Sequence, residues 1–157
     1  MLIRKLTKRF ILNSIDNLNL SAPIRYERYY INDKLRIQKK SNTFEKELLD
    51  DNNAIIEKVM INEKEFEKLK SQSYCNIIRD NFLYLDDNRI SIKKYHDDYK
   101  GLLRIEISFS TEKEMNDYVK EEWMGAEITN TPLAFDKYLS KLTKEEFKSE
   151  LEKYQIT

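Results

Sequence analysis

The stretch from residue 101 to residue 109 reads Gly101-Leu102-Leu103-Arg104-Ile105-Glu106-Ile107-Ser108-Phe109. From residue 103 onward, apolar residues at odd positions alternate with polar residues such as Arg104 and Glu106 at even positions. Because successive side chains of a β-strand point to opposite faces, this alternation predicts a strand with one apolar and one charged face. The pattern recurs at 35–38 and 90–93. Periodicity alone fits both a sheet whose polar face meets water and a barrel whose charged side chains line the interior.

Strand signals dominate the chain up to about residue 109, and helical signals follow. Asn and Asp clusters supply the turns, because the chain contains only two Gly and two Pro. An antiparallel sheet of about eight strands tends to close or fold on itself to remove its edges. We therefore expect strands at 2–12, 25–31, 35–38, 44–49, 54–61, 76–85, 89–95 and 102–109, and helices at 63–70, 110–119, 133–142 and 143–154.

Length and composition narrow the classes of protein. A chain of 157 residues suits one domain, with strands over about 2–109 and a helical C-terminal part over about 111–157. Lys plus Arg equals Asp plus Glu at 28 each, so bulk nucleic-acid binding is not expected. No apolar run reaches the roughly 18 residues needed to cross a membrane. The single cysteine, Cys75, excludes an internal disulfide and favours a cytoplasmic location.

The order of segments carries further information. The strand at 101–109 is followed by a Ser/Glu-rich helix and then by Trp123-Met124-Gly125-Ala126-Glu127-Ile128-Thr129. This order resembles the CYTH, or triphosphate-tunnel, superfamily, in which a Gly-Leu pair opens a strand ending Glu-Val-Glu-Phe and a Trp-x-Gly-x-Glu-Val-Thr segment comes later. The hairpin at 26–38 and the helix start at 61–69 resemble the same family more weakly. The resemblance covers roughly residues 3–140.

The resemblance implies an α+β fold, an antiparallel eight-stranded β-barrel or tunnel with flanking and C-terminal helices. In that family, basic side chains in the tunnel grip a triphosphate, and glutamates hold one or two divalent metals, usually magnesium or manganese. Its members include inorganic, thiamine and RNA triphosphatases and a class of adenylyl cyclases. The chemistry is coherent, because metal ions together with Arg and Lys neutralise the charge that phosphoryl transfer must handle.

The sequence departs from this family at its acidic positions. The first-strand signature Glu-x-Glu-x-Lys is matched here by 5–9, which retains a base at Arg9 but places Lys5 and Thr7 at the two glutamates. In the late strand, Glu106 matches the first glutamate and a serine, residue 108, replaces the second. Two further departures are Gln38 at an arginine position and Lys93 where an aspartate is common.

In this alignment the interior carries many cations and few carboxylates. Glu106 is the candidate metal ligand, although a salt bridge to a neighbouring base fits it equally well. We identify no catalytic residue. The expected phosphate-binding residues are Arg9, Arg36, Lys46, Arg79, Lys93 and Arg104, with Lys5 also in the interior and Glu57 beside Glu106 as a second acid.

These residues predict a cationic tunnel that binds a triphosphate-containing small molecule, polyphosphate or nucleotide, with metal-dependent hydrolysis weakened or lost. The cofactor is then magnesium or manganese, or none. Three alternatives remain at this stage: an active metal-dependent triphosphatase, a catalytically dead interaction module, and an unrelated half-exposed β domain. The sequence leaves the substrate and the oligomeric state open.

Overall fold

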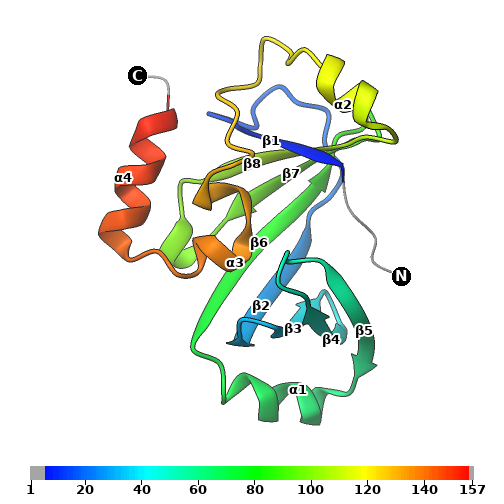
Figure 1. Cartoon of the computed structure of the whole chain (residues 1–157), viewed down its shortest axis with the longest axis vertical. Coiled ribbons are helices and arrows are strands. Elements are labelled where there is room, and N and C mark those ends of the chain that lie inside the picture. Colours follow the sequence, from blue (N-terminus) through cyan, green and yellow to red (C-terminus); the bar gives the residue numbers. More distant parts are fainter. Residues whose placement is uncertain (1–5, 156–157) are drawn as a thin grey trace.

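The structure is a computed structural model, and it describes residues 6–155. An eight-stranded antiparallel sheet forms its centre, in the strand order β1-β8-β7-β6-β2-β3-β4-β5 (Figure 1). This confirms the expected α+β class. The strands are β1 (Thr7–Ile11), β2 (Ile24–Asn32), β3 (Leu35–Lys40), β4 (Thr43–Leu49), β5 (Ile55–Ile61), β6 (Cys75–Leu83), β7 (Ile90–Tyr95) and β8 (Leu103–Ser108). The helices are α1 (Glu63–Lys70), η1 (Asp97–Tyr99), α2 (Glu112–Asp117), η2 (Pro132–Ala134), α3 (Asp136–Leu139) and α4 (Lys144–Tyr154).

The helical predictions differ in accuracy. Helix α4 matches its prediction and begins with a capping box, in which Thr143 and Glu146 satisfy each other's backbone N–H groups. The continuous helix expected at 133–142 is wrong. Phe135 is extended there, with φ −128° and ψ 128°, and separates η2 from the four-residue α3. The part of the first predicted strand at 2–5 lies outside the described residues.

The segment with the Trp-x-Gly-x-Glu pattern lies along β1, on the edge opposite β8. The Gly125 and Ile128 amides donate to the carbonyls of Ile11 and Arg9, at 2.8 Å each, and the Ile11 amide donates to Ala126 at 2.9 Å. These hydrogen bonds pair the backbone groups of β1 that would otherwise be left unpaired at the edge of the sheet. They also fix the point from which the chain continues into η2 and α3.

The two faces of the sheet have different chemistry. The outer face is apolar: Phe10, Ile92 and Ile105 belong to one cluster, which α2 covers, and Tyr29 and Ile37 pack with Phe66 of α1 in another. The inner face is the one that carries the even-numbered residues of β8, beginning with Arg104. Cross-strand pairing continues it through Arg9↔Glu106, Lys93↔Arg104, Arg79↔Tyr95, Tyr26↔Arg79, Tyr30↔Arg36 and Arg36↔Glu47.

The inner face is covered by the C-terminal part of the chain. Leu133 and Leu139 are fully buried against Ile11, Tyr30 and other inner-face residues, and α4 joins the same apolar cluster. Figure 1 shows α3 and α4 on one side of the sheet and α1 below β3 and β4. The face is therefore closed by packed helices at one end, and its charged side chains are buried behind them.

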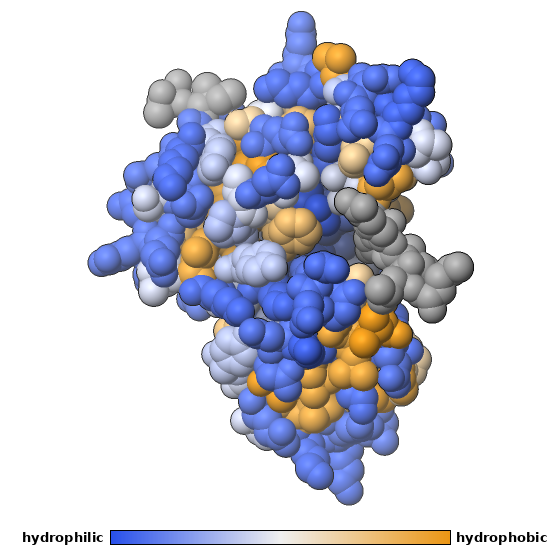
Figure 2. Space-filling view, viewed as in Figure 1, coloured by the Kyte–Doolittle hydropathy of each residue, from blue (hydrophilic) through white to orange (hydrophobic). Residues whose placement is uncertain are grey.

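Strand β5 lies at the end of the strand order and is mostly exposed. Ile56, Val59 and Met60 leave 39–63% of their surface accessible, and Figure 2 shows apolar surface gathered in the region of β5. Within residues 6–155, no strand pairing joins β5 to β1. In the same part of the chain, no helix is long and apolar enough to span a membrane.

Gly125 is required by the close approach of its segment to β1. A Cβ atom at this position would lie 2.7 Å from both the carbonyl oxygen and the Cγ2 atom of Ile11. We expect Gly125→Ala to lower the free energy of unfolding by about 1–3 kcal/mol, because either β1 or the segment must shift. Urea denaturation measures this, with Asn130→Ala, an exposed position in the same segment, as the control. Equal stability of the two variants would contradict the assignment of the segment to the β1 edge.

Candidate functional site

Six neighbouring strands each contribute a buried or largely buried cation to the inner face. We call this group the cation cluster. Five of its members are buried, and the sixth, Arg28, has a side chain that is 16% exposed. Burying a charge is costly unless it is paired and hydrogen-bonded, so a cluster of this size must be held by anions. Its members, in strand order, are Arg9 (β1), Arg104 (β8), Lys93 (β7), Arg79 (β6), Arg28 (β2) and Arg36 (β3).

Asp136, at the start of α3, is the principal anion of the cluster. Its Oδ2 accepts hydrogen bonds from Arg28 at 2.9 Å and Arg79 at 3.0 Å, and its Oδ1 accepts from the Tyr95 hydroxyl at 2.6 Å. Arg104 lies 3.4 Å from the same carboxylate. One buried carboxylate thus joins four strands.

Two further carboxylates lie on strands of the sheet. Glu106 is 3.2 Å from the Lys93 ammonium and 3.6 Å from the Arg9 guanidinium. Glu47 faces Arg36, which donates to its two oxygens at 3.3 and 3.4 Å. Each acid is therefore occupied by at least one cation of the cluster.

Burial and pairing act against each other in the pKa values of the cluster. Burial lowers the pKa of Lys93 to about 7, and the attraction of Glu106 only partly offsets this effect. Burial raises the pKa of a carboxyl group, but the neighbouring cations outweigh it and hold the pKa values of Glu106 and Asp136 well below their usual range. At neutral pH both acids are ionised, and Lys93 is close to its titration midpoint.

Positive charge exceeds negative charge in this interior. The six cations face three carboxylates, since Glu45, a fourth buried acid nearby, pairs instead with Lys58 at 3.3 Å. Within the described part of the chain, the Nε atoms of Arg9 and Arg104 are buried and have no hydrogen-bond partner. Buried donors in native proteins are nearly always paired, so these two indicate capacity for an additional acceptor.

The structure brings together most of the residues selected from the sequence. Arg9, Arg36, Arg79, Lys93 and Arg104 all belong to the cation cluster. The interior positions expected for Lys46 and Glu57 are wrong, and Lys5 lies outside the described residues. Lys46 and Glu57 lie on the outer side of β4 and β5, because alternation assigns the inner side to their neighbours Glu45, Glu47 and Lys58; Lys46 instead pairs with Glu65 of α1 at 3.7 Å.

Reasoning from the sequence missed three residues of the site, one cation of the cluster and two of its carboxylate partners. Arg28 and Glu47 stand two residues from other inner-face positions, so strict two-residue spacing along β2 and β4 would have found them. Asp136 offered no such signal, because it lies between two short helices and not on a strand. Only the tertiary structure places its carboxylate among the arginines.

The residues do not fit a divalent metal of the kind that the resemblance implies. Magnesium prefers several oxygen ligands with few competing cations, whereas each cluster carboxylate is bound by Arg or Lys. Thr7 and Ser108, which replace two glutamates of the family pattern, are direct cross-strand partners. Among residues 6–155, no three His, Cys, Asp or Glu side chains gather to hold a metal.

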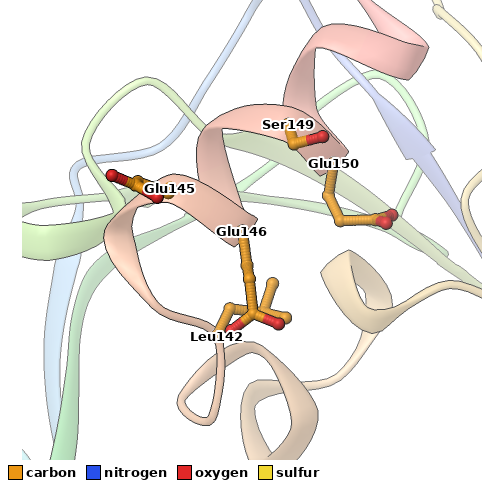
Figure 3. A pocket seen from close by; sticks show the side chains of 5 residues that line it. All are labelled: Leu142, Glu145, Glu146, Ser149 and Glu150. Carbon is orange, nitrogen blue, oxygen red and sulfur yellow. The ribbon is translucent and has the colours of Figure 1, made fainter.

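A surface recess near the start of α4 is not suited to an anion. Figure 3 shows its lining, in which Glu145 and Glu150 point away from each other. The lining residues are Leu142, Glu145, Glu146, Ser149 and Glu150. Three carboxylates there repel phosphate, so the buried cation cluster remains the anion site that the described residues offer.

Comparison with solved structures defines the fold. Two crystal structures of NE1496, one described as a hypothetical protein and the other as an inorganic triphosphatase, match with TM-scores of 0.71 and 0.72. They share 14% sequence identity with this chain, and the matches cover 87% and 90% of it and 97% of each NE1496 chain. This chain therefore has the same fold as NE1496. At this identity the likeness concerns the fold alone; no protein-family model matches the sequence, and no curated protein is significantly similar to it.

The lowered pKa of Lys93 makes the stability of this protein depend on pH. The ordinary pKa is 10.5 and the native value is about 7, so the unfolded chain binds more protons between these pH values. The free energy of unfolding should therefore rise with pH over this window, by at most about 1.4 kcal/mol per pH unit.

Urea denaturation at pH 6, 7.5 and 9 tests this dependence. The Lys93→Met variant lacks the titrating ammonium and keeps a side chain of similar length, so its stability should rise less over the same range. The difference between the two proteins isolates Lys93 from other titrating groups. Parallel pH profiles would show that Lys93 titrates normally in the native state.

Proposed function

We propose that the chain binds a triphosphate-containing small molecule, a polyphosphate or a nucleotide at the cation cluster, with metal-dependent hydrolysis weakened or lost. The observation that carries this proposal is the excess of buried cations over carboxylates, together with the Nε atoms of Arg9 and Arg104, which have no hydrogen-bond partner among the described residues. A buried group of side chains with an excess of one sign of charge attracts the opposite sign, and the arginine guanidinium can bind two phosphate oxygens at once. The fold shared with the inorganic triphosphatase NE1496 supports the same class of ligand.

The loss of hydrolysis follows from the acids that are missing. Metal-assisted phosphoryl transfer needs carboxylates that are free to bind a cation. Here hydroxyl groups stand at Thr7 and Ser108, and Glu106 is engaged by Lys93 and Arg9. The alternative, an active triphosphatase using magnesium or manganese, is supported by the description of NE1496 as an inorganic triphosphatase. A cytoplasmic location and a single domain spanning residues 1–157 complete the proposal.

Calorimetric titration of inorganic tripolyphosphate tests the proposal, once with Mg²⁺ and once with a chelator. We expect binding under both conditions, because arginine and lysine supply the charge. Lys93→Met should weaken binding by about 10- to 100-fold, the range for one hydrogen bond to a charged group. Lys94→Met makes the same substitution at the exposed neighbour on the outer face and should leave the affinity unchanged.

A phosphate-release assay with Mg²⁺ or Mn²⁺, run in parallel, separates the alternatives. We expect little or no release. Binding that requires the metal, accompanied by steady release, would establish the active triphosphatase instead. Absence of binding in both titrations would contradict the proposed function and favour a protein-interaction module.

A further inference from the structure

The cations that the proposed function requires are covered by one short segment of the same chain. We call residues 131–142, which include η2 and α3, the cover segment. The Leu133 carbonyl accepts a hydrogen bond from Arg104 at 3.1 Å, and the Arg9 guanidinium lies 4.5 Å from the centre of the Phe135 ring. The Asp136 carboxylate binds Arg28 and Arg79. Three nearby positions of this segment thus engage four cations from four strands.

This cover is nearly complete. Arg79 and Arg104 are only 2% and 3% exposed, and the Asp136 side chain is 1% exposed. A triphosphate is larger than the carboxylate that now lies among these arginines, so it cannot contact them while the segment stays in place. A triphosphate that contacts Arg79 and Arg104 directly must therefore displace the Asp136 carboxylate.

The chemistry of the carboxylate makes it a substitute for a phosphate. Its two oxygens receive two guanidinium groups and a tyrosine hydroxyl, and a third guanidinium lies within 3.4 Å. Terminal phosphate oxygens use the same donors, and a triphosphate brings more negative charge than one carboxylate. Asp136 also neutralises a cluster whose cations would otherwise repel one another when no ligand is bound.

We infer that Asp136 is a built-in competitor for the anion site, and that binding of a triphosphate-type anion expels its carboxylate and shifts α3. This inference rests on the proposed function and adds its regulation: the affinity for the anion is set by how firmly the cover segment holds. Release needs no change in the sheet, because α3 has only four residues and is joined to η2 through the extended Phe135.

The test compares tripolyphosphate binding to the wild-type protein, to Asp136→Asn and to Asp80→Asn. Asparagine keeps the shape of the side chain and removes the competing charge, so Asp136→Asn should bind at least tenfold more tightly. Asp80→Asn is the matched control: it removes the same charge from an ion-paired aspartate of β6 that contacts Arg25 and His96 away from the cluster. Its affinity should equal that of the wild type.

Hydrogen exchange on the wild-type protein gives a second readout that does not depend on the folding of a variant. The Leu139 and Ser140 amides donate to the Phe135 and Asp136 carbonyls at 2.9 Å each. Saturating tripolyphosphate should accelerate exchange at these two amides while the amides of β7 and β8 stay protected.

The outcomes separate the two proposals. Tighter binding by Asp136→Asn than by the wild-type protein, together with faster exchange in α3, supports the competitor. Equal affinity and unchanged exchange, with the anion still bound, would overturn it and leave the proposed function standing. No binding by any of the three proteins would remove the proposed function and this inference with it.

Discussion

The buried carboxylate of Asp136 is the interaction on which the interior of this protein depends. Without it, Arg28, Arg79 and Arg104 would lie close together in a region of low dielectric with no shared counter-charge. Removal of one partner from a buried ion pair typically costs about 3–5 kcal/mol, because the remaining charge stays buried and unpaired. The position of α3 over the sheet is therefore set by charge as well as by the apolar contacts of Leu133 and Leu139.

A structural role and a ligand-binding role make conflicting demands on such an interior. A cluster built only for stability would balance its charges and satisfy every donor. Here the cations outnumber the carboxylates, and the Nε atoms of Arg9 and Arg104 have no hydrogen-bond partner among the described residues. Lys93 meets part of the excess by losing its proton near neutral pH, since its pKa falls to about 7. The interior thus keeps an excess of positive charge that an additional anion would offset.

The sequence predicted the sheet well because the alternation of side chains is local information. Arg104 and Glu106 could be assigned to one face from their spacing, and the same argument reached Arg36 and Lys93, whereas Arg79 was selected from the resemblance to the family. It failed for Lys46 because spacing alone does not say which of the two faces is the inner one. It also missed Asp136, since a residue between two short helices has no periodicity; its role depends on contacts more than fifty residues away in sequence, such as that with Arg79.

The excess of cations that disfavours a metal site also creates the need for a carboxylate from outside the sheet. In the family that the sequence resembles, acids on the strands hold metals that in turn bind phosphate. Here Thr7 and Ser108 carry no charge, and the nearby strand carboxylate, Glu106, forms its ion pairs with Lys93 and Arg9. The counter-charge for Arg79 and Arg104 then comes from outside the sheet, from the Asp136 carboxylate. The arginines of the sheet therefore take their shared counter-charge from the cover segment.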